Sequence, residues 1–173
     1  MGGLWVNANS TTAAQRAPLD ILPLTAPDAD MLFRLRNDPF VVSFSRSQAR
    51  VAWDDHIAWF SRCLDAPDQH RLFYLYETGK ILGVMRFERA DGDSAVITIY
   101  LLKHATGSGR GTEAIEKGCR LIVATWGVER VYAEVLADNE RSLRSFAKAG
   151  FQPVGPRRAV DGATLVWCAI SAD

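Results

Sequence analysis

Three alternate glycines form the part of the sequence that is best suited to chemistry. Gly107, Gly109 and Gly111 lie in the segment 106–112, which reads Thr-Gly-Ser-Gly-Arg-Gly-Thr. Glycine lets the backbone turn sharply and approach a ligand closely. A helix that begins directly after such a turn directs unpaired N–H groups and the positive end of its dipole at one point. The segment therefore predicts an anion site, and a diphosphate is its natural ligand.

Two common nucleotide motifs fit this segment poorly. A nucleoside-triphosphate loop ends in Gly-Lys-Ser/Thr, whereas this segment ends in Arg110-Gly111-Thr112 without a lysine. A dinucleotide fingerprint needs a third glycine at the sixth position, and counting from Gly107 that position is Thr112. The glycines alone leave a further alternative open, which is a tight turn between a strand and a helix that binds nothing.

A second motif follows in the segment 135–151, Val-Leu-Ala-Asp-Asn-Glu-Arg-Ser-Leu-Arg-Ser-Phe-Ala-Lys-Ala-Gly-Phe. This segment resembles motif B of the GNAT superfamily of N-acetyltransferases, and 106–111 resembles motif A of the same superfamily. The positions that carry the motif B pattern are Asn139, Ser142, Phe146, Lys148, Gly150 and Phe151. The two motifs occur in the usual order and separation, and the resemblance extends from about Leu19 to Ile170.

The resemblance implies an α/β (α+β) single-domain fold. Its mixed, mostly antiparallel and twisted sheet would have about seven strands, splayed between the fourth and fifth, and about four flanking helices. Acetyl-CoA would enter the splay as co-substrate, without a metal. Its pyrophosphate would lie on the backbone of Gly107, Ser108, Gly109, Arg110, Gly111 and Thr112.

The same resemblance implies further contacts with the coenzyme. Backbone groups of Leu101, Leu102 and Lys103 would pair with the pantetheine arm like an added strand. One N–H group there would polarise the thioester carbonyl, as in an oxyanion hole. Four positions of motif B would also contact the coenzyme: Asn139, Ser142, Phe146 and Lys148. The alternatives are that Asn139 is the N-cap of its helix and that Lys148 only complements the helix dipole.

The sequence departs from the family pattern at two positions. Thr106 stands where motif A usually begins with Arg or Gln, and Phe146 stands where many members carry a Tyr that protonates the departing thiolate. Phenylalanine cannot donate a proton, so another group or water does so, or the thiolate leaves unaided, since a thiol has an ordinary pKa of about 8.5. These departures keep open an alternative function, a coenzyme-binding module without catalysis.

Glu134 and Tyr100 are the candidate catalytic residues. Glu134 alternates with apolar neighbours on an expected strand and is placed to take a proton from an amine, with a solvated carboxylate as the alternative. Tyr100 ends another expected strand, where its ring would line the acceptor site or simply pack. Two histidines, His56 and His104, are weaker candidates for the base because neither has a visible acidic partner.

Hydrophobic periodicity predicts the elements that position these residues. The chain order is strand, two helices, three strands, helix, strand, helix and two strands. The expected strands are 19–24, 72–76, 81–87, 95–102, 131–136, 151–154 and 164–170. The expected helices are one that begins near 27–28 and stops at 37–39, and then 53–64, 112–126 and 139–149. Residues 1–18 are expected to form a flexible tail, and 19–173 the acetyltransferase domain.

The acceptor is the least determined part of the function. Arg36-Asn37, the helix with His56, Trp59 and Phe60, Ile99-Tyr100 and Glu134-Val135 together resemble the acetyltransferases of pseudaminic acid biosynthesis, which act on a nucleotide-linked amino sugar. A ribosomal-protein or other N-terminal acetyltransferase, or one for another small amine, is the alternative.

Composition limits the partners. Lys plus Arg equals Asp plus Glu, so the basic excess of a nucleic-acid binder is missing. No segment is apolar enough to span a membrane. The three cysteines, Cys63, Cys119 and Cys168, show no zinc or redox spacing, which favours reduced thiols and a cytoplasmic location. We expect a small-molecule amine as partner, with neither nucleic acid nor membrane, and the sequence leaves a homodimer open.

Overall fold

One mixed sheet organises the chain in the computed structural model, which describes residues 16–90, 92–155, 158–160 and 163–171. The strands are β1 Asp20–Pro23, β2 His70–Glu77, β3 Lys80–Ala90, β4 Ser94–Leu101, β5 Arg130–Leu136, β6 Gln152–Pro153, β7 Arg158–Val160 and β8 Ala163–Ser171. Their order across the sheet is β1-β2-β3-β4-β5-β8-β6, and β7 also pairs with β8. Every pairing is antiparallel except that of β4 with β5, which is parallel.

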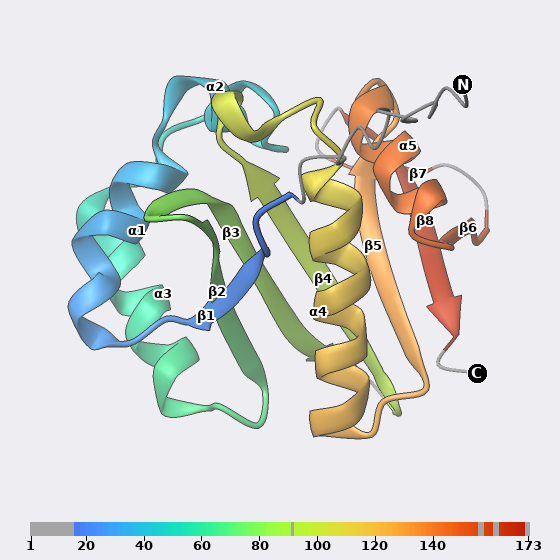
Figure 1. The fold of residues 1–173 in the computed structure, drawn as a ribbon, viewed down its shortest axis with the longest axis horizontal. Coiled ribbons are helices and arrows are strands. Elements are labelled where there is room, and N and C mark those ends of the chain that lie inside the picture. The colour runs from blue at the N-terminus through green and yellow to red at the C-terminus, as the bar shows by residue number, and fades with distance from the viewer. Residues whose placement is uncertain (1–15, 91, 156–157, 161–162, 172–173) are drawn as a thin grey trace, which may run out of the picture.

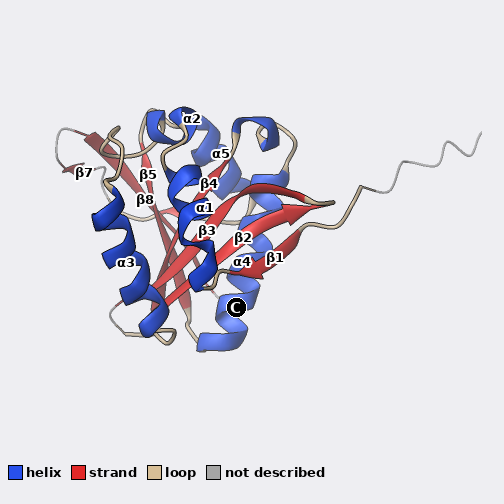
Figure 2. Ribbon diagram, turned by 90° about the vertical axis from the view of Figure 1, so that its left-hand side faces the viewer, coloured by secondary structure: helices blue, strands red, loops and turns tan. Residues whose placement is uncertain are grey.

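Helices cover both faces of this sheet (Figures 1 and 2). They are α1 Ala29–Arg36, α2 Pro39–Ser43, α3 Trp53–Asp65, α4 Arg110–Trp126 and α5 Glu140–Lys148, with 3₁₀ turns at Ala26–Asp28 and Lys103–Ala105. The helices α1 and α3 pack on one face, and α4 with α5 on the other. Within the described residues, no helix has the length and apolar character needed to cross a membrane.

The expected fold class is confirmed, with two elements that the sequence analysis did not predict. Pro39 was expected only to end the first helix, but it also begins α2, because proline is favoured in the first turn. The carboxylate of Asp38 caps this helix by accepting from the N–H of Phe40 at 2.9 Å. The second addition is the three-residue strand β7. Residues 1–15 of the expected tail, and residues 161–162 between the last two expected strands, lie outside the described residues.

Two hydrophobic clusters hold the helices to the sheet. The larger one joins α4 and α5 to the sheet through residues such as Met85, Phe87, Ile115 and Ile122, all at most 1% exposed. The smaller one joins α1 and α3 to the other face. Burying one such side chain contributes about 1.5–3 kcal/mol, so these clusters fix the sheet and helices as a rigid frame. Cys63 and Cys119 are buried free thiols within them, and the side chain of Cys168 is outside the described part of the chain.

The parallel pair β4 and β5 stays together for only half of its length. Ser94 pairs with Arg130, and the pairing ends where Ile97 meets Ala133. Beyond that point β5 remains paired with β8 up to Leu136, while β4 continues along β3 up to Leu101. The two strands therefore part towards their carboxyl ends, at the position where the sequence predicts a splay.

A buried arginine anchors the start of α4 beside this gap. Arg110 is 2% exposed, and its guanidinium forms ion pairs with Glu77 at the end of β2 and with Glu113 one turn further along α4. It also donates to the carbonyl of Ala17. Lys117 donates to the carbonyl of Leu19 at 3.1 Å. These bonds fix the helix start to the edge of the sheet and to the segment that leads into β1.

Gly118 sets how closely α4 approaches the sheet. A Cβ atom at this position would lie 2.3 Å from Cε and 2.5 Å from Sδ of Met85, and 3.2 Å from Cζ of Phe87. Met85 is itself fully buried, so it has little space into which to move.

We therefore expect Gly118→Val to lower the free energy of unfolding by about 1–3 kcal/mol through overpacking, although valine is the better helix former. Chemical denaturation measures this change. The control is Ala124→Val at an exposed position of the same helix, which should change stability by only a few tenths of a kcal/mol. Equal effects of the two substitutions would contradict the close approach.

Candidate active site

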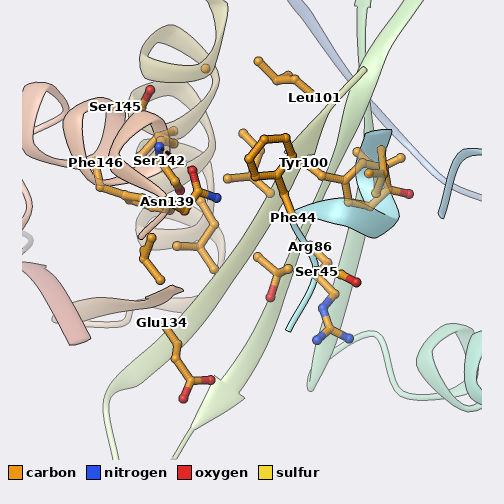
Figure 3. A pocket seen from close by; sticks show the side chains of 18 of the residues that line it. Phe44, Ser45, Arg86, Tyr100, Leu101, Glu134, Asn139, Ser142, Ser145 and Phe146 are labelled. Atoms are coloured by element: carbon orange, nitrogen blue, oxygen red, sulfur yellow. Dashed lines mark hydrogen bonds between the residues drawn. The ribbon is translucent and has the colours of Figure 1, made fainter. Parts of the chain in front are cut away.

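The gap between β4 and β5 opens into a cleft of about 1140 Å³. Figure 3 shows side chains from β3, β4, β5, α5 and the segment directly after α2 around it. Most residues that the sequence analysis singled out line this cleft: Tyr100, Leu101, Gly107, Gly109, Gly111, Thr112, Glu134, Asn139, Ser142, Phe146 and Lys148. Residues that are far apart in the sequence are therefore brought together at one site.

Backbone groups of β4 face the gap without a strand to pair with. The N–H of Leu102 donates to the carbonyl of Leu82 at 2.8 Å. In an antiparallel pair, residues that are hydrogen-bonded across the strands alternate with residues that are not. Tyr100, two residues before Leu102, therefore also directs its N–H and C=O groups to β3. Ile99 and Leu101 direct their N–H and C=O groups away from β3. Since β5 has diverged at this level, the N–H and C=O groups of Ile99 and Leu101 remain open to an extended ligand.

The glycine segment lies at the end of the same cleft. Gly107 and Gly109 have φ values of 77° and 81°, in the left-handed region that side chains other than glycine rarely adopt. The first backbone bond of α4 runs from the N–H of Glu113 to the carbonyl of Gly109 at 3.2 Å. The preceding N–H groups therefore have no helical partner, which is the arrangement expected for an anion site.

Four residues with predicted coenzyme contacts do not line the cleft with their side chains. They are Leu102, Lys103, Ser108 and Arg110. Ser108 donates from Oγ to the carbonyl of Ala105 at 2.9 Å, and Arg110 points into its buried ion pairs. The structure therefore does not place these four residues at the cleft, and the N–H of Leu102 is already engaged with Leu82.

Motif B forms the facing wall through α5. The side chain of Asn139 caps this helix by accepting from the N–H of Ser142 at 3.1 Å, so the expected N-cap is present. Asn139, Ser142 and Ser145 lie along the cleft in Figure 3. Phe146 is 3% exposed and packs edge to face against Phe151, with ring centroids 4.9 Å apart. The ring at the usual tyrosine position thus belongs to the core as well as to the cleft.

Glu134 lies on the other face of the sheet from Val135, as the alternation in the sequence predicts. It follows Ala133, the last residue of β5 that pairs with β4, and so stands at the beginning of the gap. Its carboxylate is 27% exposed and lies 3.7 Å from a guanidinium nitrogen of Arg46. This long ion pair leaves the carboxylate accessible to a second cation.

Tyr100 belongs to the same face as Glu134 and packs against the cluster under α1 and α3. Its hydroxyl is buried and has no hydrogen-bond partner among the described residues. Burial raises the pKa of Tyr100, so the phenol remains protonated and can donate. Tyr100 lines the cleft, and the sequence gave no sign of this missing partner.

The two histidines are placed differently. His56 lines the cleft, but it is buried and its Nε2 lies 2.9 Å from the carbonyl of Ala29, which ties α3 to α1. His104 lies in the 3₁₀ turn before the glycine segment and does not line the cleft.

Sequence reasoning did not identify Arg46 and Arg86 as cleft residues. Arg86 lies on the sheet face that contains Val84 and Tyr100, so strand alternation carried across the β3–β4 register would have found it. Arg46 is in a loop, and no pattern signals its position. Among the described residues, no group of His, Cys, Asp or Glu is arranged to hold a metal ion.

Comparisons with solved structures agree on the fold. An aminoglycoside acetyltransferase AAC(6')-Ib in complex with coenzyme A and kanamycin superposes with a TM-score of 0.77 at 18% identity, covering 90% of this chain and 95% of that one. The spermidine N-acetyltransferase from Vibrio cholerae in complex with CoA and spermine gives 0.76 at 15% identity, covering 88% and 95%. The microcin C7 self-immunity acetyltransferase MccE in complex with acetyl-CoA and AMP gives 0.74 at 18%, covering 88% and 92%.

The family assignment comes from the sequence itself. No curated protein sequence matches the chain significantly. The family model described as "Acetyltransferase (GNAT) domain", however, matches residues 19–152, well over half of the chain. With the parted strands, the glycine turn before α4 and the capped α5 in their expected places, the chain belongs to the GNAT family of acetyltransferases.

Proposed function

We propose that the protein transfers the acetyl group of acetyl-CoA to the primary amine of a small molecule, by direct attack within a ternary complex. The observation that carries the proposal is the cleft between β4 and β5, where open backbone groups and the glycine turn lie along one groove. The two free buried thiols, Cys63 and Cys119, further support a reducing, cytoplasmic setting.

The cleft fits an elongated ligand with an anionic end. The pyrophosphate would accept hydrogen bonds from the N–H groups of residues 107–112, where the helix dipole also favours negative charge. The amide-containing arm would pair with the backbone of Ile99 and Leu101 as an added strand. An amide arm satisfies the groups that β5 leaves open, which neither a nucleoside triphosphate nor an isolated phosphate would do.

Glu134 is our candidate for the general base. The amine nitrogen attacks the thioester carbonyl carbon, the carbon–sulfur bond breaks, and the carboxylate takes the proton that the nitrogen loses, directly or through water. A substrate ammonium group would compete with Arg46 for Glu134, which the 3.7 Å separation allows. A free N–H group of β4 would stabilise the negative charge on the carbonyl oxygen.

The departing thiolate lacks the usual phenolic donor because residue 146 is phenylalanine. Tyr100 does not replace this donor. Its side chain packs on the sheet face covered by α1 and α3, whereas residue 146 belongs to α5 on the other face. We propose that the sulfur leaves as the thiolate and takes its proton from water. This step is feasible near neutral pH, because an ordinary thiol pKa of about 8.5 makes the thiolate a tolerable leaving group.

Aromatic side chains on the acceptor side suit a ring-shaped acceptor. Phe40 and Phe44 of the α2 region and Trp59 of α3 line the cleft there. These aromatic side chains support the nucleotide-linked amino sugar, which the sequence suggests, as one candidate acceptor. Another small amine or a protein N-terminus belongs in the same acceptor panel.

Coenzyme binding is tested by ligand-induced stabilisation. Acetyl-CoA at about 100 times its Kd should stabilise the wild type by about 2.7 kcal/mol, seen as a raised Tm. Gly109→Ala should greatly reduce this shift, because a side chain at φ 81° strains the turn that presents the N–H groups. The control Gly79→Ala introduces similar strain at φ 84° in an open hairpin turn and should leave the shift unchanged. Stabilisation by NADH or ATP but not by acetyl-CoA would refute the proposed function.

The role of Glu134 is tested by thiol release with an amine panel. Glu134→Gln should lower kcat by about 10²- to 10⁴-fold and leave the Kd of acetyl-CoA unchanged, because the side chain faces the acceptor. Glu140→Gln, an exposed carboxylate of α5 paired with Arg144, is the matched control and should keep full turnover. Unchanged turnover in Glu134→Gln would remove the assignment of the base.

A further inference from the structure

Two buried donors face the acceptor side of the cleft without an acceptor in the described protein. They are Nη1 of Arg36, at the end of α1, and the hydroxyl of Tyr100, near the end of β4. Both residues line the cleft. Buried polar groups normally have hydrogen-bond partners, and a charged donor without one is especially unfavourable. Two such donors at one cleft indicate that a ligand atom completes their bonding.

A second guanidinium lies beside them. Arg86 is half-buried on the sheet face shared with Tyr100, and its guanidinium lies 5.5 Å from the ring centroid of Trp59. Arg86 is a diagonal neighbour of Tyr100 across the β3–β4 register, and Arg36 lines the same cleft. Both guanidinium groups act against the rise in pKa that burial causes at Tyr100. The three side chains thus form a donor cluster, Arg36, Arg86 and Tyr100, with two formal positive charges.

The donor cluster is not neutralised by the carboxylates of the cleft. Asp55 and Glu88 also line the cleft, but both are exposed, and no ion pair joins either of them to Arg36 or Arg86 in the described chain. Two guanidinium groups and a phenol hydroxyl have donors and no strong acceptor, which is the complement of a carboxylate or a phosphate.

The sheet register places this cluster opposite the proposed base. Arg86 of β3 pairs with Thr98 of β4, and Thr98 is level with Glu134 of β5, one residue beyond the last paired couple. Adjacent strands lie about 4.8 Å apart, so the strand positions of Arg86 and Glu134 are separated by roughly 10 Å. Figure 3 shows the two side chains on opposite sides of the gap. One compact molecule can span this distance.

Resting on the proposed function, we propose that the acceptor carries an anionic group, a carboxylate or a phosphate, which Arg36, Arg86 and Tyr100 bind while its amine lies at Glu134. The cluster would repel an acceptor that has only ammonium groups. This specificity therefore differs from that of the fold relatives solved with kanamycin or with spermine, whose ligands are amines without an anion.

The test compares amines in matched pairs that differ only in the anion. Glucosamine is compared with glucosamine 6-phosphate, and an amino acid amide with the free amino acid, so the two pairs distinguish phosphate from carboxylate. Spermidine and kanamycin represent polycations. The kcat/KM is measured by release of the coenzyme thiol. We expect at least about a tenfold preference for the anionic member of one pair, since a hydrogen bond to a charged group is worth that factor or more.

Variants then assign the preference to the cluster. Arg36→Gln and Tyr100→Phe should each raise KM for the anionic acceptor about tenfold more than KM for its neutral partner, so that the preference is lost. Arg36→Lys should restore part of it. Arg34→Gln, which removes an exposed arginine of the same helix, should keep the full preference. Tyr100→Phe should have a Tm no lower than the wild type, because it removes an unpartnered buried hydroxyl.

The outcomes separate this proposal from the proposed function. Turnover of neutral amines or polycations in preference to the anionic members, or a preference that survives Arg36→Gln, overturns the anion site but not the acetyltransferase. Failure of acetyl-CoA to bind overturns the proposed function. If acetyl-CoA binds and nothing is acetylated, calorimetry of the same pairs with wild type and Arg36→Gln decides. The anion site is supported if the wild type binds the anionic member of a pair more tightly than the neutral member and Arg36→Gln does not. It is overturned if the wild type binds both members equally.

Discussion

The parting of β4 and β5 is the constraint on which the rest of the structure depends. A sheet edge inside a domain normally exposes backbone groups that must find partners. Here β5 is held along its whole length by β8, and β4 by β3, so neither strand can close the gap after Ile97 and Ala133. The frame therefore maintains an open pair of strand edges, and a ligand that resembles an extended peptide is the natural way to complete it.

Backbone and side chains have different roles at the glycine turn. The turn offers N–H groups to an anion, and its own charged residue, Arg110, points in the opposite direction to hold the turn in place. Burial acts to raise the pKa of Glu113, but hydrogen bonds from Lys117 and Arg110 outweigh it and lower that pKa. A lowered folded-state pKa means that this stabilisation is present at neutral pH and is lost as the pH falls through it. The proposed anion site is thus supported by charged residues that do not themselves line the cleft.

Much of the fold and many residues of the candidate site could be predicted from sequence because periodic and local patterns encode them. Alternation placed Glu134 and Val135 on opposite faces, and the change to a helical period after Thr112 placed α4. Sequence reasoning failed where a residue has two roles, as at Pro39, which ends one helix and begins another. Arg36 was grouped with Tyr100 only through the resemblance to a known family. Arg86 was not recognised as a neighbour of Tyr100, because their proximity depends on the β3–β4 register.

The bond from Arg110 to the carbonyl of Ala17 spans 93 positions in the sequence. Contacts of such separation carry a large loop-closure entropy and are slow to form. The start of α4 is therefore anchored only after β1 has joined the sheet. The strands with which β1 assembles, beginning with β2, are synthesised much later than β1. During synthesis, the nascent chain would also need β8, which holds β5 away from β4, before the whole site could form. Ligand binding would therefore report that folding of the domain is complete.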